Sequence, residues 1–402
     1  MDKFLFDTHA GAPPRVPPMA PRGFALLELG FRPFYLLASI FAALSIGLWA
    51  LQFSGLVGVP YLRGPAWHAH EMLFGFTLAV VTGFLFTAGR NWSGQPTPTG
   101  LPLAALALLW IAGRVLVLTP LGWAAAVVNT AFTLSVAIAL ARPLLAAGNK
   151  RNYFFVALLV FMAAAQLAFH LGQLGVMRWP AWAGVGLGLD AVLIIMAVMA
   201  GRVIPMFTNG GVPGAGARSI AWLEKISLAL LVALLAADVL ALRGWMTAVL
   251  ALAAALAHLA RWLLWKPWKT PGAPMVWVLH IAYFWIPVHL ALRGFADLGL
   301  LPASAAIHAL TVGAAGGLII GMMTRTARGH TARPLRASRM DIACYALVLA
   351  AAPVRVLLPL AAPGFTVQAV LISALLWSAG FALYAVAYGP LLMRPRLDGK
   401  PG

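Results

Sequence analysis

Long apolar runs, each about the length of a membrane-spanning helix, recur along almost the whole chain. A helix that crosses the hydrocarbon core needs about 20 mostly apolar residues. Breaks rich in proline and glycine separate consecutive runs. The pattern therefore predicts an all-α, polytopic membrane protein with about twelve transmembrane helices. The predicted spans are residues 31–53, 67–89, 101–119, 121–141, 153–176, 181–204, 221–242, 245–265, 273–294, 303–325, 340–361 and 365–392.

The two ends of the chain differ in composition from the spans. Residues 1–30 hold several prolines and no apolar core, which is typical of a disordered tail and not of a cleaved signal peptide. We therefore predict a disordered cytoplasmic tail at 1–30, a single twelve-helix transmembrane domain at 31–392 and a short cytoplasmic tail at 393–402.

Composition and charge support this reading and orient the chain. Of its 402 residues, 62% are hydrophobic and only 9% are charged, whereas soluble domains carry about a quarter charged residues. Segments on the side of the two termini hold 22 Lys and Arg residues, and the opposite loops hold four. Because positive residues accumulate in cytoplasmic loops, both termini are predicted to be cytoplasmic. The net charge of +18 is then explained by topology, and no nucleic-acid partner is expected.

Five of the nine histidines fall at one predicted depth, in the outer halves of the spans, together with two rare intramembrane acids. Ionisable groups are costly at that depth, and facing helices can bring imidazoles together around a metal or haem. For any single histidine, a hydrogen-bonded packing role is the alternative. The residues in this layer are His68, His70, Glu71, His170, Asp190, His289 and His308.

The second span divides this chemistry between two sides of one helix. His68 and His70 lie about 200° apart around an α-helix, so they cannot both face one centre. His68 and Glu71 are three positions apart and are expected to share a face. We therefore expect one histidine to face one site, while the other, with Glu71, serves a second site or orients metal ligands.

The second, sixth and tenth spans contain similar segments, "VTGFLFTAGRN", "MAGRVIPMFTN" and "IIGMMTRTARG". Their offsets of 118 and 120 residues predict three four-helix repeats. The offsets also select His70 as the partner of His308, and a shift of 119 relates His170 to His289. The alternative is that the similarity has no structural meaning, because a glycine-rich apolar helix aligns with almost any other apolar helix.

This arrangement distantly resembles the twelve-helix catalytic subunit of haem-copper oxidases and nitric oxide reductases. In that family, histidines on the second and tenth spans hold a haem near the outer face. Here Ala306 stands where a second histidine of the tenth span is expected, and residues 181–242 contain no histidine for copper. These departures count against a binuclear centre of that design.

Four motifs in order resemble the NnrS family of bacterial multi-span proteins. They are "GFRPFYLLASI" at 30–40, "WHAHEMLFGF" at 67–76, "GRVIPMFTN" at 201–209 and "HALTVGAAGGLIIGMMTRTARGHT" at 308–331. The resemblance implies a multi-pass protein of the bacterial inner membrane that contains haem and copper and is linked to nitric oxide metabolism and nitrosative stress. The motif histidines His68, His70, His308 and His330 are the implied metal positions. Because Cys344 is the single cysteine, a covalent CxxCH haem attachment is excluded, and haem b would be bound non-covalently.

The leading functional hypothesis is an oxidoreductase that reduces nitric oxide to nitrous oxide near the periplasmic face. Its electrons would come from a quinol or a periplasmic carrier, and Glu71 and Asp190 would relay protons. The alternatives are a non-catalytic protein that binds nitric oxide or protects against nitrosative stress, and a proton-coupled transporter. The predicted haem ligands are His70, His170, His289 and His308, and the predicted metal ligands add His68 and His330.

Overall fold

The computed structural model describes residues 23–400 except 54, 60 and 179, and in these residues all regular structure is helical, as predicted. Two helices contain a π-helical stretch, η1 or η4, which continues from the α-helix before it into the one after it. The α-helical and π-helical elements are α1 (Phe31–Phe53), α2 (Gly64–His70), η1 (Glu71–Thr77), α3 (Leu78–Ser93), α4 (Gly100–Leu116), α5 (Gly122–Ala146), α6 (Tyr153–Gln173), α7 (Ala181–Gly211), α8 (Ala221–Val239), α9 (Trp245–Leu264), α10 (Pro274–Asp297), α11 (Ala303–His308), η4 (Ala309–Gly316), α12 (Gly317–His330), α13 (Arg339–Ala361) and α14 (Thr366–Met393). Three short 3-10 helices, η2 (Lys150–Asn152), η3 (Pro267–Lys269) and η5 (Pro363–Phe365), lie in the connections.

Ten helices in the described part of the chain are long and apolar enough to cross a membrane. Two more complete the predicted twelve: α4 is apolar but has 17 residues, and α8 carries Glu224, Lys225 and Asp238 within its 19 residues. Each predicted span coincides with one of these helical segments. The chain is therefore a multi-pass membrane protein, and the predicted fold class is confirmed.

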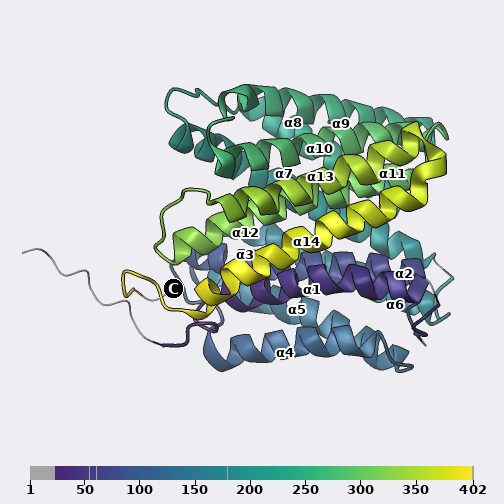
Figure 1. The fold of residues 1–402 in the computed structure, drawn as a ribbon. Coiled ribbons are helices and arrows are strands. Elements are labelled where there is room, and N and C mark those ends of the chain that lie inside the picture. The colour runs from purple at the N-terminus through teal and green to yellow at the C-terminus, as the bar shows by residue number, and fades with distance from the viewer. Residues whose placement is uncertain (1–22, 54, 60, 179, 401–402) are drawn as a thin grey trace, which may run out of the picture.

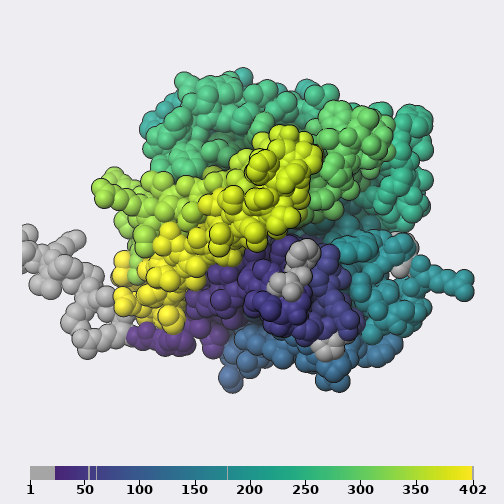
Figure 2. All heavy atoms as spheres, turned by 45° about the vertical axis from the view of Figure 1, so that its right-hand side comes forward, coloured from purple at the N-terminus to yellow at the C-terminus, as the bar shows by residue number. Residues whose placement is uncertain are grey.

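The helices lie side by side with their axes close to one direction (Figure 1). The C-terminal helix α14 packs against α13 and α1 and runs obliquely across the surface in Figure 2. The interior is formed by two helices with π-helical stretches together with α7 and α10. In the 18-residue apolar stretch of Gly64–Ser93, 78% of residues are buried, against 33% in the corresponding stretches of α1 and α14. The core helices are thus the ones that carry most of the predicted site.

The described part of the N-terminal tail is packed against the bundle. Ala25 and Leu29 are buried, and the Ala25 amide donates to the carbonyl of Met393 at 2.8 Å. The Gly100 amide donates to the carbonyl of Leu27, also at 2.8 Å. Residues 23–30 are therefore part of the folded domain, because these backbone contacts join them to α14 and α4; residues 1–22 of the predicted tail lie outside the described residues.

The two π-helical stretches occupy matching positions. They begin 238 residues apart, at Glu71 and Ala309, which is the combined offset of the sequence alignment. Each directly follows a predicted metal-site histidine, His70 or His308. Helix α7, the third aligned span, is α-helical throughout. The repeat is therefore visible in the backbone of two of the three spans, and π-helical turns are frequent at functional sites.

Candidate functional site

A cavity of about 630 Å³ lies between the core helices, at the end where α2 and α11 are found. Figure 1 places this end opposite the C-terminus. Most of its wall is apolar, and three of the five predicted outer histidines contribute to it. The ionisable side chains that line it are His68, Asp190, Asp238, Arg243, His289, Arg293, Asp297, His308 and Arg355.

The three cavity histidines are His289, which has a nitrogen without a partner among the described residues, and His308 and His68, whose rings are held in a fixed orientation. His289 donates from Nδ1 to the carbonyl of Ala306 at 2.8 Å, and its buried Nε2 has no partner among the described residues. His308 donates from Nδ1 to its own helix, to the Ser304 carbonyl at 2.7 Å. His68 packs its ring against Trp49, with centroids 4.9 Å apart. When Nδ1 carries the proton, Nε2 presents a lone pair that suits a metal.

Ion pairs hold two of the three acids that line the cavity, Asp190 and Asp238. Arg293 contacts Asp190 at 3.0 Å and Asp238 at 2.5 Å, and Asp238 also contacts Arg243 at 2.6 Å. The second oxygen of Asp190 is buried without a hydrogen-bond partner in the described structure. The predicted acid Asp190 is thus in the cavity wall, held by Arg293.

A second group, the histidine pair His70–His170, is closed within the protein. The two Nε2 atoms lie 3.1 Å apart, and both residues are fully buried. His70 Nδ1 lies 2.7 Å from Glu71 Oε1, and His170 Nδ1 lies 2.9 Å from the Tyr61 hydroxyl. Arg114 approaches the other oxygen of Glu71 at 3.1 Å. Both imidazoles are therefore oriented by an oxygen behind them.

The donors and acceptors of this group form one consistent chain. Tyr61 lies in the loop before α2, where burial raises its pKa to about 12, so its hydroxyl keeps its proton and donates to His170. An ionised Glu71, beside Arg114, can only accept from His70 Nδ1. His170 Nε2 then carries the proton that is donated to His70 Nε2. Replacing this shared proton by a metal ion would turn Tyr61 into the acceptor.

The predicted partnership of His70 with His308 is wrong. His70 faces His170, while His68 lines the same cavity as His308. Helical spacing correctly predicted that His68 and His70 face different sides of the helix. It did not specify which neighbouring helix each side contacts. The expected grouping of His68 with Glu71 is also wrong, because Glu71 turns toward the adjacent His70 as the π-helical stretch begins.

His330 lies apart from the other candidates. It ends α12 at the opposite end of that helix from η4, and its ring packs 5.7 Å from that of Phe31. In the described residues, no three His, Cys, Asp or Glu side chains converge as they would around a metal ion held by protein ligands alone. Any metal at these histidines would need further ligands from a cofactor, water or substrate.

Sequence reasoning missed several of the polar residues around the two groups. Arg243 and Arg293 were counted only as loop charges, yet both line the cavity. Arg114 and Arg355 lie inside predicted spans, and charge at that depth was a usable signal of function. Tyr61 gave no signal, because a lone tyrosine in a loop is common at a membrane interface.

The model of the NnrS protein family matches residues 25–396. The chain therefore belongs to the NnrS family. A search of curated proteins finds no match. Family membership is consistent with a membrane protein linked to the nitric oxide response.

Proposed function

We propose that this chain is a haem protein of the bacterial inner membrane that reduces nitric oxide to nitrous oxide. The observation that carries the proposal is the unpartnered, buried Nε2 of His289 in a cavity that His68 and His308 also line. The excess of positive residues at the end with the termini supports a cytoplasmic position for that end. The end of the bundle that holds the cavity would then be the periplasmic end.

The residues of the cavity fit a non-covalently bound haem b. A volume of about 630 Å³ and a largely apolar wall are typical of cofactor sites. His68, His289 and His308 are the residues that would hold the haem, because an imidazole nitrogen is a common protein ligand of haem iron. Arg355 and Arg243, which line the same cavity, would pair with the propionates, since guanidinium groups bind carboxylates bidentately. When bound, the haem supplies an iron that takes up nitric oxide and exchanges electrons.

The chain's own task in the reaction is to supply protons and exclude bulk water. Two molecules of nitric oxide, two electrons and two protons give one nitrous oxide and one water. A quinol or a periplasmic carrier would supply the electrons. Asp297 lines the cavity and has an oxygen without a hydrogen-bond partner in the described structure, so its carboxylate is the group that we place on the proton route. Glu71 contacts His70 of the histidine pair and does not line the cavity, so we assign it no part in supplying protons to the cavity.

The histidine pair fits a copper ion better than it fits haem. Two imidazole nitrogens 3.1 Å apart can bind one ion, and imidazole is a preferred ligand of copper. Oxygen partners behind both rings are the arrangement that metal-binding histidines usually have. His70 and His170 would therefore hold the copper that the family resemblance implies.

Metal analysis of purified variants tests both assignments. His308→Ala and His68→Ala should lose most of the haem measured as a pyridine haemochrome, and His170→Ala should keep the haem and lose copper. His258→Ala is the control, because His258 does not line the cavity and its Nδ1 bonds to Tyr283. Full haem content in both cavity variants would contradict the assignment.

A second candidate function is non-catalytic binding of nitric oxide. It is favoured by the separation of the two groups, because His68 and His70 project to opposite sides of one helix and so cannot hold two metals in one centre. Anaerobic incubation with a chemical reductant distinguishes the functions. Catalysis consumes nitric oxide and yields nitrous oxide over many turnovers, whereas binding stops at one equivalent with a shifted haem spectrum.

A further inference from the structure

A second, smaller cavity adjoins the histidine cavity on the side of the other end of the bundle. Its volume is about 90 Å³. Three residues, Thr77, Val192 and Ala315, line both cavities. They come from three different helices: the one that spans Gly64–Ser93, α7, and the one that spans Ala303–His330. The two cavities therefore meet at one junction.

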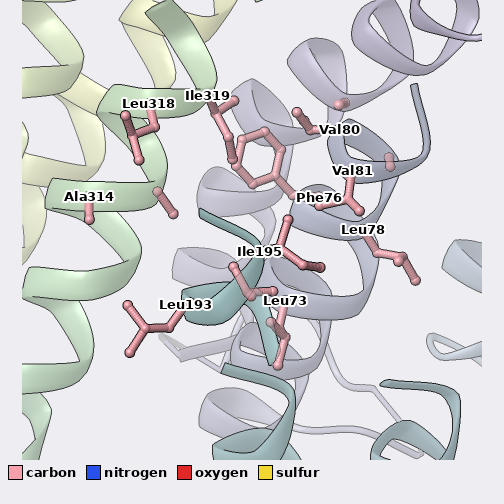
Figure 3. Close-up of a cluster of buried hydrophobic side chains, with 14 of the residues drawn as sticks. Leu73, Phe76, Leu78, Val80, Val81, Leu193, Ile195, Ala314, Leu318 and Ile319 are labelled. Carbon is pink, nitrogen blue, oxygen red and sulfur yellow. The ribbon is translucent and has the colours of Figure 1, made fainter. Parts of the chain in front are cut away.

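The order of the lining residues shows that the cavities follow one path. On α7, residues 182–192 line the histidine cavity, and residues 192–204 line the smaller one. The other two helices change over in the same way, at 77 and at 315. Figure 3 shows side chains of these three helices, including Val80, Ile195 and Ile319, close together in the core. The path thus runs between the three helices that the sequence aligned with one another.

The wall of the smaller cavity is almost entirely aliphatic and aromatic. Its hydroxyl groups are those of Tyr35 and Thr77. Thr77 already donates to the carbonyl of Met72 at 2.8 Å, which leaves the buried Tyr35 hydroxyl as the one side-chain hydroxyl of the wall without a hydrogen-bond partner in the described structure. A buried water needs two to four polar partners, and an apolar cavity of about 150 Å³ stays dry and takes up benzene or xenon. At about 90 Å³, the space is too small for a porphyrin and admits a diatomic gas or a noble-gas atom.

We propose that this cavity is a dry binding site for small apolar gas molecules and that it exchanges them with the histidine cavity through the junction of Thr77, Val192 and Ala315. Gas binding depends only on the shape and dryness of the cavity. The identity of the gas as nitric oxide rests on the proposed function. Nitric oxide is uncharged and dissolves in lipid, so a membrane-embedded store would raise its local concentration beside the cavity histidines.

Crystals of the full-length protein pressurised with xenon test the proposal. Val203 lines the cavity, and Val203→Phe should fill it. Val198→Phe is the matched control, because Val198 lies on the same helix, is also partly buried, and lines neither cavity. Wild type and Val198→Phe should show an anomalous xenon peak in the cavity, and Val203→Phe should lose it. Ordered water or a lipid chain in the wild-type cavity, no xenon peak, or an equal peak in Val203→Phe would overturn the proposal.

Photolysis of carbon monoxide from the haem-loaded protein tests the exchange between the cavities. Val203→Phe should change the fraction that rebinds from within the protein, while the haem spectrum and the Val198→Phe control stay as in wild type. An unchanged fraction would show that the cavities do not exchange gas. A protein without haem would refute the proposed function, and the xenon result would still decide whether the cavity binds gas.

Discussion

The two helices with π-helical stretches have matching backbones and different chemistry. Positions 238 residues apart correspond: His70 and His308 each precede a π-helical stretch, and Gly75 and Gly313 lie within the two stretches. His70 is fully buried against His170 and Glu71. His308 is only partly buried and lines an open cavity. Equivalent histidines thus belong to different sites.

The neighbouring residues account for this difference. After His70 comes Glu71, whose side chain holds the imidazole, whereas Ala309 follows His308 and the backbone carbonyl of Ser304 takes the same role. In the helix that spans Gly64–Ser93, the histidine that lines the cavity is His68. The position 238 residues later, in the helix that spans Ala303–His330, is Ala306. A repeated backbone therefore positions a histidine without determining what that histidine contacts.

The largest expected effect comes from breaking the ion pair between Arg114 and Glu71. This ion pair lies beside the closed group, the buried pair of His70 and His170. Arg114→Met would leave Glu71 buried without its cation, and removing one partner of a buried ion pair costs about 3–5 kcal/mol. Arg355→Met is the matched control when both variants are measured on haem-free protein, because Arg355 lines the cavity and has no ion pair there among the described residues. It should cost less than about 1 kcal/mol. Reversible unfolding in mixed detergent micelles measures both, and equal losses would remove the distinction between the closed group and the open cavity.

A smaller effect is expected from the glycine of the second π-helical stretch. A Cβ at position 313 would overlap the indole ring of Trp285, and overpacking of a core costs about 1–3 kcal/mol. Gly186→Ala is the control, since a Cβ there meets no atom within 4 Å; it should be neutral or stabilising because alanine favours a helix. The same unfolding assay compares them. A stable Gly313→Ala would mean that η4 has room to relax.

The histidine pair and the open cavity also show what the sequence could and could not predict. Apolar length and proline breaks predicted all twelve helical segments, because the membrane requires each span to satisfy its own backbone hydrogen bonds. The position of the five histidines toward one end of their helices was predictable from the direction of each span. The pairing of His70 with His170 was not, since it depends on the rotation of α2 against α6. Equally, Arg293 could not be placed in the cavity, because a charge near the end of a span can face water, lipid or protein.

Removal of the Tyr61 hydroxyl should weaken metal binding at the closed group. Tyr61→Phe leaves His170 Nδ1 without its oxygen partner, and loss of such a partner typically costs 10–100-fold in metal affinity. Copper competition titrations with a chelator measure the change, and haem content in the cavity should stay as in wild type. Unchanged copper affinity would indicate that the two histidines share a proton and not a metal ion.

The smallest effect is expected from removing the Ser304 hydroxyl in the open cavity. There the backbone orients His308, whereas a side chain orients His70 in the closed group. His308 is oriented by the backbone carbonyl of Ser304 at 2.7 Å, whereas the Ser304 hydroxyl lies 3.5 Å from the same nitrogen. Ser304→Ala keeps the carbonyl, so stability should change by less than about 0.5 kcal/mol and the haem spectrum should not shift. A shifted spectrum would mean that the side chain orients His308, as the Glu71 side chain orients His70. An unshifted one would establish that the same backbone holds one histidine through a replaceable side chain and the other through a carbonyl that substitution cannot remove.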